Sequence, residues 1–317
     1  MMMPQATCLI SFDCEGKWGI ADWVSAGQHE YFRHDRLTGV YEQLVQLLGR
    51  YELKATFAFV GAFTLSPEAY REQEERYFPD WDNTAVNPWI AAFEREMAQG
   101  TVDGWLNADA FNTVAACPGH EIAAHGFTHS PLHESWVSEA QFRHEMECLK
   151  SLPAFQGEGL TIVYPRNLVG YADLLPQYGF MAYREALKPD RTTLKGRIVN
   201  LLDEINIFRT SQKHAEEGKL VKVPAGFVLN WRFGVRKKIP VRITLRRWDH
   251  LLRHAIRKKR VFHLWAHPHN FSSGEHMFDQ FERIIEKLAE ASKSGAIITM
   301  TQQEYARQYL MAEGRPF

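Results

Sequence analysis

The sequence lacks long apolar runs, paired cysteines and net charge. Without an uninterrupted apolar run of about 18 residues, a bilayer-crossing helix is not expected. Its 4 cysteines (Cys8, Cys14, Cys117, Cys148) form no Cys-x-x-Cys pair, so we expect free thiols in a reducing compartment rather than a disulfide framework. The 37 Lys+Arg against 38 Asp+Glu argue against a protein that coats nucleic acid, although a local patch is still allowed.

Apolar and aromatic side chains are plentiful instead. The chain has 317 residues, of which 45% are hydrophobic and 13% aromatic, which is enough for a large core and excludes a disordered chain. Met1–Thr7 shows no basic segment followed by an apolar one, so no secretory signal is predicted and a cytoplasmic location is expected. The length suits one large domain or two medium ones.

Strand-like runs alternate with segments of helical period along most of the chain. The predicted strands are 7–13, 54–60, 121–124, 160–164, 220–223, 261–265 and 296–300. Apolar spacing predicts helices over 37–48 and 278–288, and the capping boxes Ser138/Gln141 and Thr301/Glu304 begin two more. Such β-then-α repeats predict a parallel sheet, open or closed into a barrel. Residues 66–115 interrupt the rhythm as a predicted insertion, and residues 185–215 are polar and irregular.

Two carboxylates stand at the end of the first predicted strand, in Ser11-Phe12-Asp13-Cys14-Glu15. Because side chains alternate across a strand, Asp13 and Glu15 should share one face and Cys14 the other. The carboxyl end of a barrel strand is where catalytic groups of this architecture lie. The alternative is an Asp that merely caps the next element.

A histidine cluster follows the strand predicted at 121–124. His120-Glu121 is followed by three residues before His125, so the two-residue spacing of a zincin helix is not met. His125 and His129 are four apart, a spacing that on one helical turn lets two imidazoles reach one metal ion. With Asp13 and Glu15 they predict a site of two histidines and one carboxylate. His120 is interpreted as structural.

Two further clusters follow later strands. Arg166, in Tyr164-Pro165-Arg166-Asn167, could hold a carboxylate bidentately and keep it ionised, or could be an ordinary loop arginine. In the segment 263–270, His263 and His267 should share one strand face. His267 stands directly before a proline at the strand end, where it is placed for proton transfer, whereas His263 could be a core residue.

In their order, these motifs resemble those of the polysaccharide deacetylase family, the NodB-like carbohydrate esterases of family 4. The resemblance runs from about Thr7 to Met300 and is most specific in Gly119–Ile122 and His125–His129. Ser11–Glu15 resembles the family's T-F-D-D, and Leu53–Gly61 its second strand. The third motif survives only as Arg166, with Val169 near the place of its tyrosine. Gly126 stands where the family has Ser or Thr, and a fourth motif, D-x-x-x-W, has no clear counterpart.

The resemblance implies a distorted (β/α)7-type barrel, one domain over residues 1–317 with the insertion at 66–115, and metal-dependent amide hydrolysis. Carried over residue by residue, it makes Asp13 the general base, His267 the general acid and Arg166 the residue that orients Asp13. It makes His125 and His129 metal ligands, with Glu15 as the third ligand in place of the family's second Asp. A Cys14 thiolate ligand would need the opposite strand face. Zn²⁺ suits such ligands, with Fe²⁺, Co²⁺ or Ni²⁺ as alternatives.

The implied activity is removal of an acyl group, N-acetyl above all, from an amino sugar. A cytoplasmic location favours a precursor of a surface polysaccharide, either a nucleotide sugar or a lipid-linked sugar. The tryptophans of the insertion, Trp81, Trp89 and Trp105, could stack on sugar rings or serve the core equally well. Two alternatives stay open: a related amidohydrolase for a formamide or small ureide, and a catalytically inactive sugar-binding protein.

Residues 230–260 are strongly basic, with Asp249 as their only acid. Trp248, Leu251, Leu252, Ala255 and Ile256 form one apolar helix face, so this basic amphipathic helix could lie against an anionic membrane as a peripheral contact, or bind phosphate groups. It could equally be a barrel helix with a core face and solvated charges. Nucleic acid is not expected as a partner. The cations are Arg232, Arg236, Lys237, Lys238, Arg242, Arg246, Arg247, Arg253, Arg257, Lys258, Lys259 and Arg260.

Overall fold

The computed structural model describes residues 5–22, 26–77, 88–186, 212 and 220–315. All nine named strands join one parallel sheet, in the order β6-β5-β4-β3-β2-β1-β8-β7 with β9 paired to β1. The strands are β1 (Ala6–Cys14), β2 (Thr56–Phe59), β3 (Glu121–Ala124), β4 (Leu160–Ile162), β5 (Phe180–Arg184), β6 (Val221–Val223), β7 (Phe227–Val228), β8 (Val261–Ala266) and β9 (Ile297–Met300).

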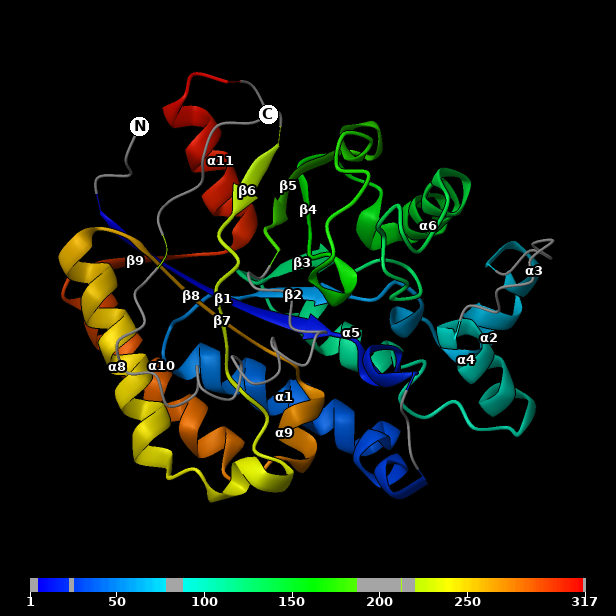
Figure 1. The fold of residues 1–317 in the computed structure, drawn as a ribbon, viewed down its shortest axis with the longest axis horizontal. Coiled ribbons are helices and arrows are strands. Elements are labelled where there is room, and N and C mark those ends of the chain that lie inside the picture. Colours follow the sequence, from blue (N-terminus) through cyan, green and yellow to red (C-terminus); the bar gives the residue numbers. More distant parts are fainter. Residues whose placement is uncertain (1–4, 23–25, 78–87, 187–211, 213–219, 316–317) are drawn as a thin grey trace.

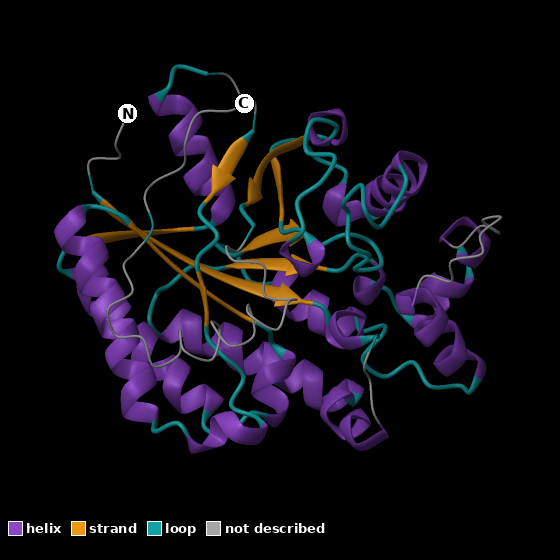
Figure 2. Cartoon of the chain, in the orientation of Figure 1, coloured by secondary structure: helices purple, strands orange, loops and turns teal. Residues whose placement is uncertain are grey.

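Helices surround the sheet (Figure 2). They are α1 (His34–Arg50), α2 (Pro67–Arg71), α3 (Glu74–Tyr77), α4 (Pro88–Ala98), α5 (Ala108–Ala115), α6 (Glu139–Ser151), α8 (Val241–Lys258), α9 (His269–Ser273), α10 (Met277–Lys293) and α11 (Gln302–Ala312). The predicted insertion is helical, since α2, α3, α4 and α5 lie between β2 and β3, with α2 to α4 beyond the arrowheads of β1 and β2 (Figure 1). Among the described helices, none combines the length and hydropathy of a membrane span.

The long central strand β1 organises the sheet. One edge of β1 pairs with β8 from Thr7 to Phe12. Because a strand has two hydrogen-bonding edges, β2 and β9 share the other edge: β9 pairs with residues 6–9, and β2 with residues 11–14. All nine residues of β1 are buried, which explains its nearly continuous apolar sequence.

The two faces of β1 have different chemistry. Cys8, Ile10, Phe12 and Cys14 belong to the large cluster packed under the helices. On the other face, Leu9 packs at the amino end of the sheet in a second cluster that includes four buried residues of α11. Ser11 and Asp13, further along that same face, are polar and buried. On this face of β1, a buried apolar residue, Leu9, is therefore followed by polar side chains toward the carboxyl end.

Most elements predicted from the sequence are confirmed. Every predicted strand overlaps an observed one, 121–124 matches β3 residue for residue, and both capping boxes form as predicted at the starts of α6 and α11. The sequence patterns missed two short strands, β5 and β7. Of the irregular segment 185–215, residues 187–211 and 213–215 lie outside the described residues.

Candidate metal centre

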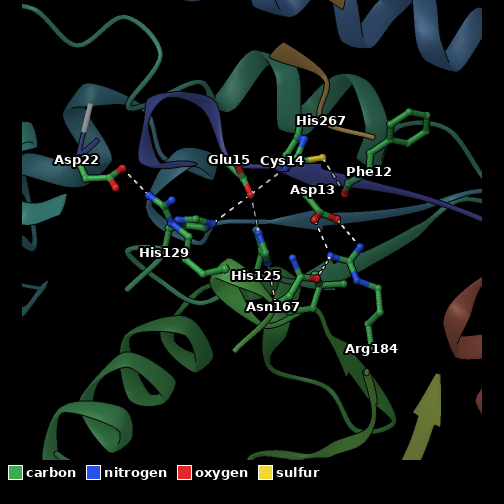
Figure 3. A network of polar contacts seen from close by, with 12 residues as sticks. Phe12, Asp13, Cys14, Glu15, Asp22, His125, His129, Asn167, Arg184 and His267 are labelled. Carbon is green, nitrogen blue, oxygen red and sulfur yellow. Dashed lines mark hydrogen bonds and ion pairs between the residues drawn. The ribbon is translucent and has the colours of Figure 1, made fainter. Parts of the chain in front are cut away.

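Asp13 and Glu15 project from the carboxyl end of β1 on the same side, as the strand alternation predicts (Figure 3). Both carboxylates are buried, with exposed fractions of 1% and 6%. Glu15 directly precedes a short 3₁₀ helix, Gly16–Ile20, and its side chain lies against Gly19. A Cβ at Gly19 would lie 1.7 Å from Glu15 Oε2, so only glycine leaves room for this carboxylate.

His125 and His129 come from the loop that follows β3, not from a helical turn. The helical placement predicted from their spacing is therefore wrong. Gly126 and His129 have left-handed backbones, with φ of 72° and 60°, and turn both imidazoles toward β1. Glu145 of α6 holds this loop by accepting hydrogen bonds from the backbone N–H groups of Phe127 (2.8 Å) and Thr128 (3.0 Å).

Three donor atoms converge at the centre of the site. His125 Nε2 lies 3.0 Å and His129 Nε2 3.1 Å from the same carboxylate oxygen, Glu15 Oε1 (Figure 3). All three side chains are buried. Burial, opposed by Glu15, lowers the pKa of His129 to about 4, so this imidazole is neutral near pH 7.

The backbone fixes the tautomer of His125. Its Nδ1 lies 2.7 Å from the carbonyl oxygen of Val163, and only an N–H at Nδ1 can donate to that oxygen. In the neutral ring, Nε2 then presents its lone pair to Glu15 Oε1, so two acceptors face each other. A cation between these atoms removes the conflict. Two imidazole nitrogens and one carboxylate oxygen are ligands that suit a divalent transition metal, so Glu15, His125 and His129 fit such an ion.

His267 lies on the other side of Glu15. It follows the end of β8, and its Nε2 is 3.5 Å from Glu15 Oε1. Burial opposes a charge on this ring, but Glu15 and Asp13 outweigh burial and raise the pKa of His267. For Glu15, burial by itself would raise the pKa. His267 and His129 outweigh burial and hold the pKa of Glu15 well below its usual value. The site therefore pairs an ionised carboxylate with a histidine that holds its proton more tightly than a free imidazole does.

Arg184, not Arg166, holds Asp13. Its Nη1 and Nη2 donate to the two carboxylate oxygens of Asp13 at 2.7 and 2.6 Å (Figure 3). The predicted role of Arg166 is therefore wrong, because Arg166 contacts Asp22 instead. Burial by itself would raise the pKa of Asp13, but the guanidinium of Arg184 outweighs burial and lowers it. Asp13 thus stays ionised inside the protein.

Arg184 is the site residue that sequence reasoning missed. It is the last residue of β5, whose sequence Phe180–Arg184 is a strand-like run that ends in a cation. Asn167 Oδ1 accepts a hydrogen bond from Arg184 Nη2 at 3.0 Å, and the guanidinium carbon lies 4.5 Å from the centre of the Trp265 ring. Arg166 and Asn167 both have φ of 57°, so a loop of two consecutive left-handed residues brings Asn167 to this contact.

Other residues singled out from the sequence lie outside the metal centre. Cys14 is buried on the opposite face of β1, where it interacts with Tyr41, and burial raises the pKa of its thiol well above the usual value. His120 accepts a hydrogen bond from the backbone of Ala55 at the amino end of the sheet. His263 contacts Ser11 Oγ (2.9 Å) and the Pro224 carbonyl (2.6 Å), and burial lowers its pKa to about 3.

The sugar-stacking interpretation is wrong for Trp105. This side chain is fully buried and packs against Trp18 and Phe93 in the core. Its Nε1 donates to Glu96 Oε2, which also binds the buried ammonium of Lys17 at 2.7 Å. The segment after Glu15 is thereby fixed to the insertion. Trp81 lies outside the described residues, as does the side chain of Trp89.

Comparisons with known proteins identify the fold. No protein-family model and no curated protein matches the sequence. A crystal structure from Mycobacterium smegmatis, assigned to the polysaccharide deacetylases, superposes with a TM-score of 0.56 at 15% identity, over 100% of this chain and 94% of that one. The Xyl-CE4 domain of a xylanase from the hindgut metagenome of Trinervitermes trinervoides gives 0.42 at 14%, over 98% and 92%. Peptidoglycan deacetylase PdaC from Bacillus subtilis gives 0.38 at 10%, over 98% and 96%.

The last two scores are too low to support an argument, so the inference rests on the first superposition, which covers this chain from end to end. It confirms the predicted distorted (β/α)7-type barrel, here an open parallel sheet centred on β1. The TM-score of 0.56 shows a shared architecture, but at 15% identity the activity has to be argued from the site itself. The chain thus has the fold of the polysaccharide deacetylases.

Proposed function

We propose that this chain is a metal-dependent hydrolase that removes an N-acetyl group from an amino sugar of a surface-polysaccharide precursor. The observation that carries the proposal is the convergence of His125 Nε2 and His129 Nε2 on Glu15 Oε1. The deacetylase fold supports amide hydrolysis as the reaction. Zn²⁺ is the proposed metal, with Fe²⁺, Co²⁺ or Ni²⁺ as alternatives.

The metal would be held by Glu15, His125 and His129. A divalent cation there would polarise the amide carbonyl and make a nearby water molecule more acidic. The proton transfers of the reaction are assigned to side chains of the protein.

Asp13 and His267 are the proposed acid–base pair. A carboxylate oxygen of Asp13 and a nitrogen of His267 both lie within 4.8 Å of Glu15, so the two groups flank the metal centre. Asp13, kept ionised by Arg184, takes a proton from the attacking water. His267, whose pKa is raised by Glu15 and Asp13, gives a proton to the departing amine. An amide C–N bond breaks readily only when the leaving nitrogen receives that proton.

The proposed substrate is a nucleotide-linked or lipid-linked amino sugar, met in the cytoplasm. A finished cell-wall polymer would lie outside the cell, whereas its precursors are made inside. The acyl group is proposed to be acetyl because the fold is that of deacetylases.

Metal content tests the metal centre directly. Purified protein is compared with His125→Ala and His129→Ala after incubation with Zn²⁺, Co²⁺ or Ni²⁺ and removal of the excess. We expect about one ion per wild-type chain and a large loss in both variants, because each variant removes one of three ligands. Full occupancy in both variants, or none in the wild type, contradicts the proposed centre.

Substrate class is tested separately by product release. Acetate is measured from nucleotide-linked and lipid-linked N-acetyl amino sugars, with a formamide and a ureide in the same panel. Acetate release from a sugar, abolished in Asp13→Asn, is expected. Turnover of the formamide or ureide alone would instead identify the related amidohydrolase.

A further inference from the structure

The apolar face of α8 is not available for a partner. Trp248, Leu251, Leu252 and Ala255 have exposed fractions of 6% or less, because α8 packs on the barrel beside α10. The interpretation of α8 as a barrel helix with a core face is therefore confirmed, and a membrane contact through that apolar face is excluded. Any partner of α8 must use the opposite, charged face.

That charged face carries a straight row of arginines. Arg242, Arg246, Arg253 and Arg257 are all exposed, and their spacings of four, seven and four residues place them within an arc of about 60°. The row extends over 15 residues, or about 22 Å along the helix. Asp249 is the only acid of α8, and its carboxylate already bridges Arg253 and Lys287 at 2.9 Å each. Within the described ranges, Arg242, Arg246 and Arg257 have no ion-pair partner.

An exposed apolar tip directly precedes this row. Val235 is 73% and Phe233 37% exposed, two of the four large hydrophobic side chains found exposed among the described residues. Two exposed cations, Lys237 and Lys238, follow them in the 3₁₀ helix Gly234–Lys238, which leads into α8 (Figure 1). An apolar tip bordered by cations is the arrangement that lets a side chain enter the headgroup region of a bilayer while lysines meet lipid phosphates.

We infer that the apolar tip (Phe233, Val235) and the arginine row (Arg242, Arg246, Arg253, Arg257) form a docking surface for an anionic membrane. Charge complementarity indicates an anionic partner. The net charge of the whole chain is only −1, so these solvent-facing cations are a local concentration of positive charge. Exposed Val235 favours lipid over nucleic acid, because a phosphate backbone offers an isopropyl group nothing to contact. A nucleotide base would need a free aromatic face on which to stack. The Phe233 ring already stacks on Trp231 at 4.6 Å, and the ammonium of Lys237 lies over the Phe233 ring.

A series of ring contacts links the tip to the metal centre, and it begins where Phe233 stacks on Trp231. Trp231, two residues before Phe233, lies 6.3 Å from His269, which in turn stacks on His267 at 5.2 Å. Three ring contacts, through Trp231 and His269, therefore connect the tip to His267. If the proposed deacetylase function holds, this connection favours a lipid-linked amino sugar over a nucleotide sugar as the substrate.

Vesicle binding tests the docking surface without using activity, so its failure and the failure of the proposed hydrolase are distinguishable. Full-length protein is sedimented with vesicles of phosphatidylcholine containing 30% phosphatidylglycerol, and with pure phosphatidylcholine, at low and high salt. We expect binding to the anionic vesicles only, and weaker binding at high salt. Arg242→Glu/Arg246→Glu should lower the partition coefficient by roughly 30-fold or more, and Val235→Ser by about fivefold.

Matched controls separate location from net charge and hydropathy. Arg71→Glu/Lys293→Glu makes the same charge change at exposed cations of α2 and α10, and Met311→Ser removes an apolar side chain that is 63% exposed on α11. Both controls should bind as the wild type does, and circular dichroism checks that every variant is folded. Equal binding to neutral vesicles, no binding to either, or equal losses in variants and controls would overturn the inference. So would arginine-dependent binding to duplex DNA in place of vesicles.

Discussion

Glu15 and Glu121 are two buried carboxylates at opposite ends of one parallel sheet, with exposed fractions of 6% and 7%. Glu15, at the carboxyl end of β1, faces three imidazoles, those of His125, His129 and His267. Glu121, at the amino end of β3, accepts hydrogen bonds from Thr56 Oγ1 (2.7 Å), from the hydroxyl of Thr161, and from the backbone N–H of Gln303 (2.9 Å).

Their pKa values move in opposite directions. Burial raises the pKa of Glu121, and its neutral hydrogen-bond donors only partly oppose the rise. The histidines around Glu15 outweigh burial and lower its pKa. Burial by itself therefore does not mark a functional carboxylate. The groups around the carboxylate distinguish a functional one from a structural one. Hydroxyl and amide donors fix a structure, whereas neutral imidazoles can bind a cation together with the carboxylate.

The largest expected effect comes from exchanging these two residues for glutamine. Glu15→Gln should abolish metal binding and lower kcat/KM by at least about 10³-fold, because it removes a charged ligand. Glu121→Gln should leave metal content unchanged and kcat/KM within about twofold, since its contacts lie at the far end of the sheet. Metal analysis and steady-state kinetics on both variants measure the difference. Equal losses of activity in the two variants would contradict the assignment of Glu15 as functional and Glu121 as structural.

The arginine that holds Asp13 should have the next largest effect. Arg184→Met leaves a buried carboxylate without its cation, so we expect about 3–5 kcal/mol lower stability and a fall in kcat of about 10²-fold or more. Arg166→Met is the matched control, because the Arg166–Asp22 pair is partly exposed and should contribute about 1 kcal/mol or less. Urea unfolding and kinetics compare the two variants. A larger loss in Arg166→Met would restore Arg166 as the residue that matters to Asp13.

The buried pair Lys17–Glu96 tests how the metal centre depends on the insertion. Both side chains are buried, and Lys17 is only two residues from Glu15. Lys17→Met should lower the free energy of unfolding by about 3–5 kcal/mol, because it leaves Glu96 without its cation. Lys17→Met/Glu96→Leu should regain part of that loss, because no uncompensated charge is left. Exchange of the exposed Arg33 for Met is the control and should leave the unfolding midpoint unchanged.

A double variant as unstable as Lys17→Met would show that the ion pair is not the cause. The metal content of the folded variants is a second measurement. We expect it to fall less than in Glu15→Gln, because Lys17 fixes the backbone near the metal centre without being a ligand. Complete loss of metal in folded Lys17→Met would place this pair in the metal centre rather than in its support.

The smallest expected effect is a change in pH dependence at Glu121. Its raised folded-state pKa means that the native state binds the proton more tightly than the unfolded chain, whose pKa is about 4.3. The resulting stability is complete below that pH and is lost as pH rises through the folded-state pKa. Glu121→Gln has no such proton, so its stability relative to the wild type should increase from pH 4.5 to 7. Denaturant unfolding at several pH values checks the sign, and a constant difference would contradict it.

Local pattern predicted the parts of the site that depend on one strand. The period of two along β1 places Asp13 and Glu15 together and sends Cys14 into the core, as the sequence indicates. The spacing of His125 and His129 identified the right pair for the wrong reason. A helical turn was predicted, but Gly126 and the left-handed His129 turn the loop after β3 so that both rings reach Glu15.

Arg184 could not be predicted in this way. β5 is five residues long and buried throughout, so it shows no polar–apolar alternation, and nothing local relates its last residue to Asp13, 171 positions earlier. The motif resemblance pointed to Arg166, which lies in the expected loop but contacts Asp22. Likewise, the sequence of α8 showed two faces of opposite character, but only packing against α10 showed that the apolar face belongs to the core.

Apart from β5 and β7, the sequence by itself determined the succession of strands and helices along the chain, the face of β1 that carries Asp13, and the residue types available to bind a metal. These follow from side-chain period and from local capping, which act over a few residues. Only the tertiary structure decided which arginine reaches Asp13, that a loop rather than a helical turn brings His125 and His129 to Glu15, and that Glu121 lies at the other end of the sheet. Those contacts depend on strand order and register, which bring together atoms from chain segments more than a hundred residues apart.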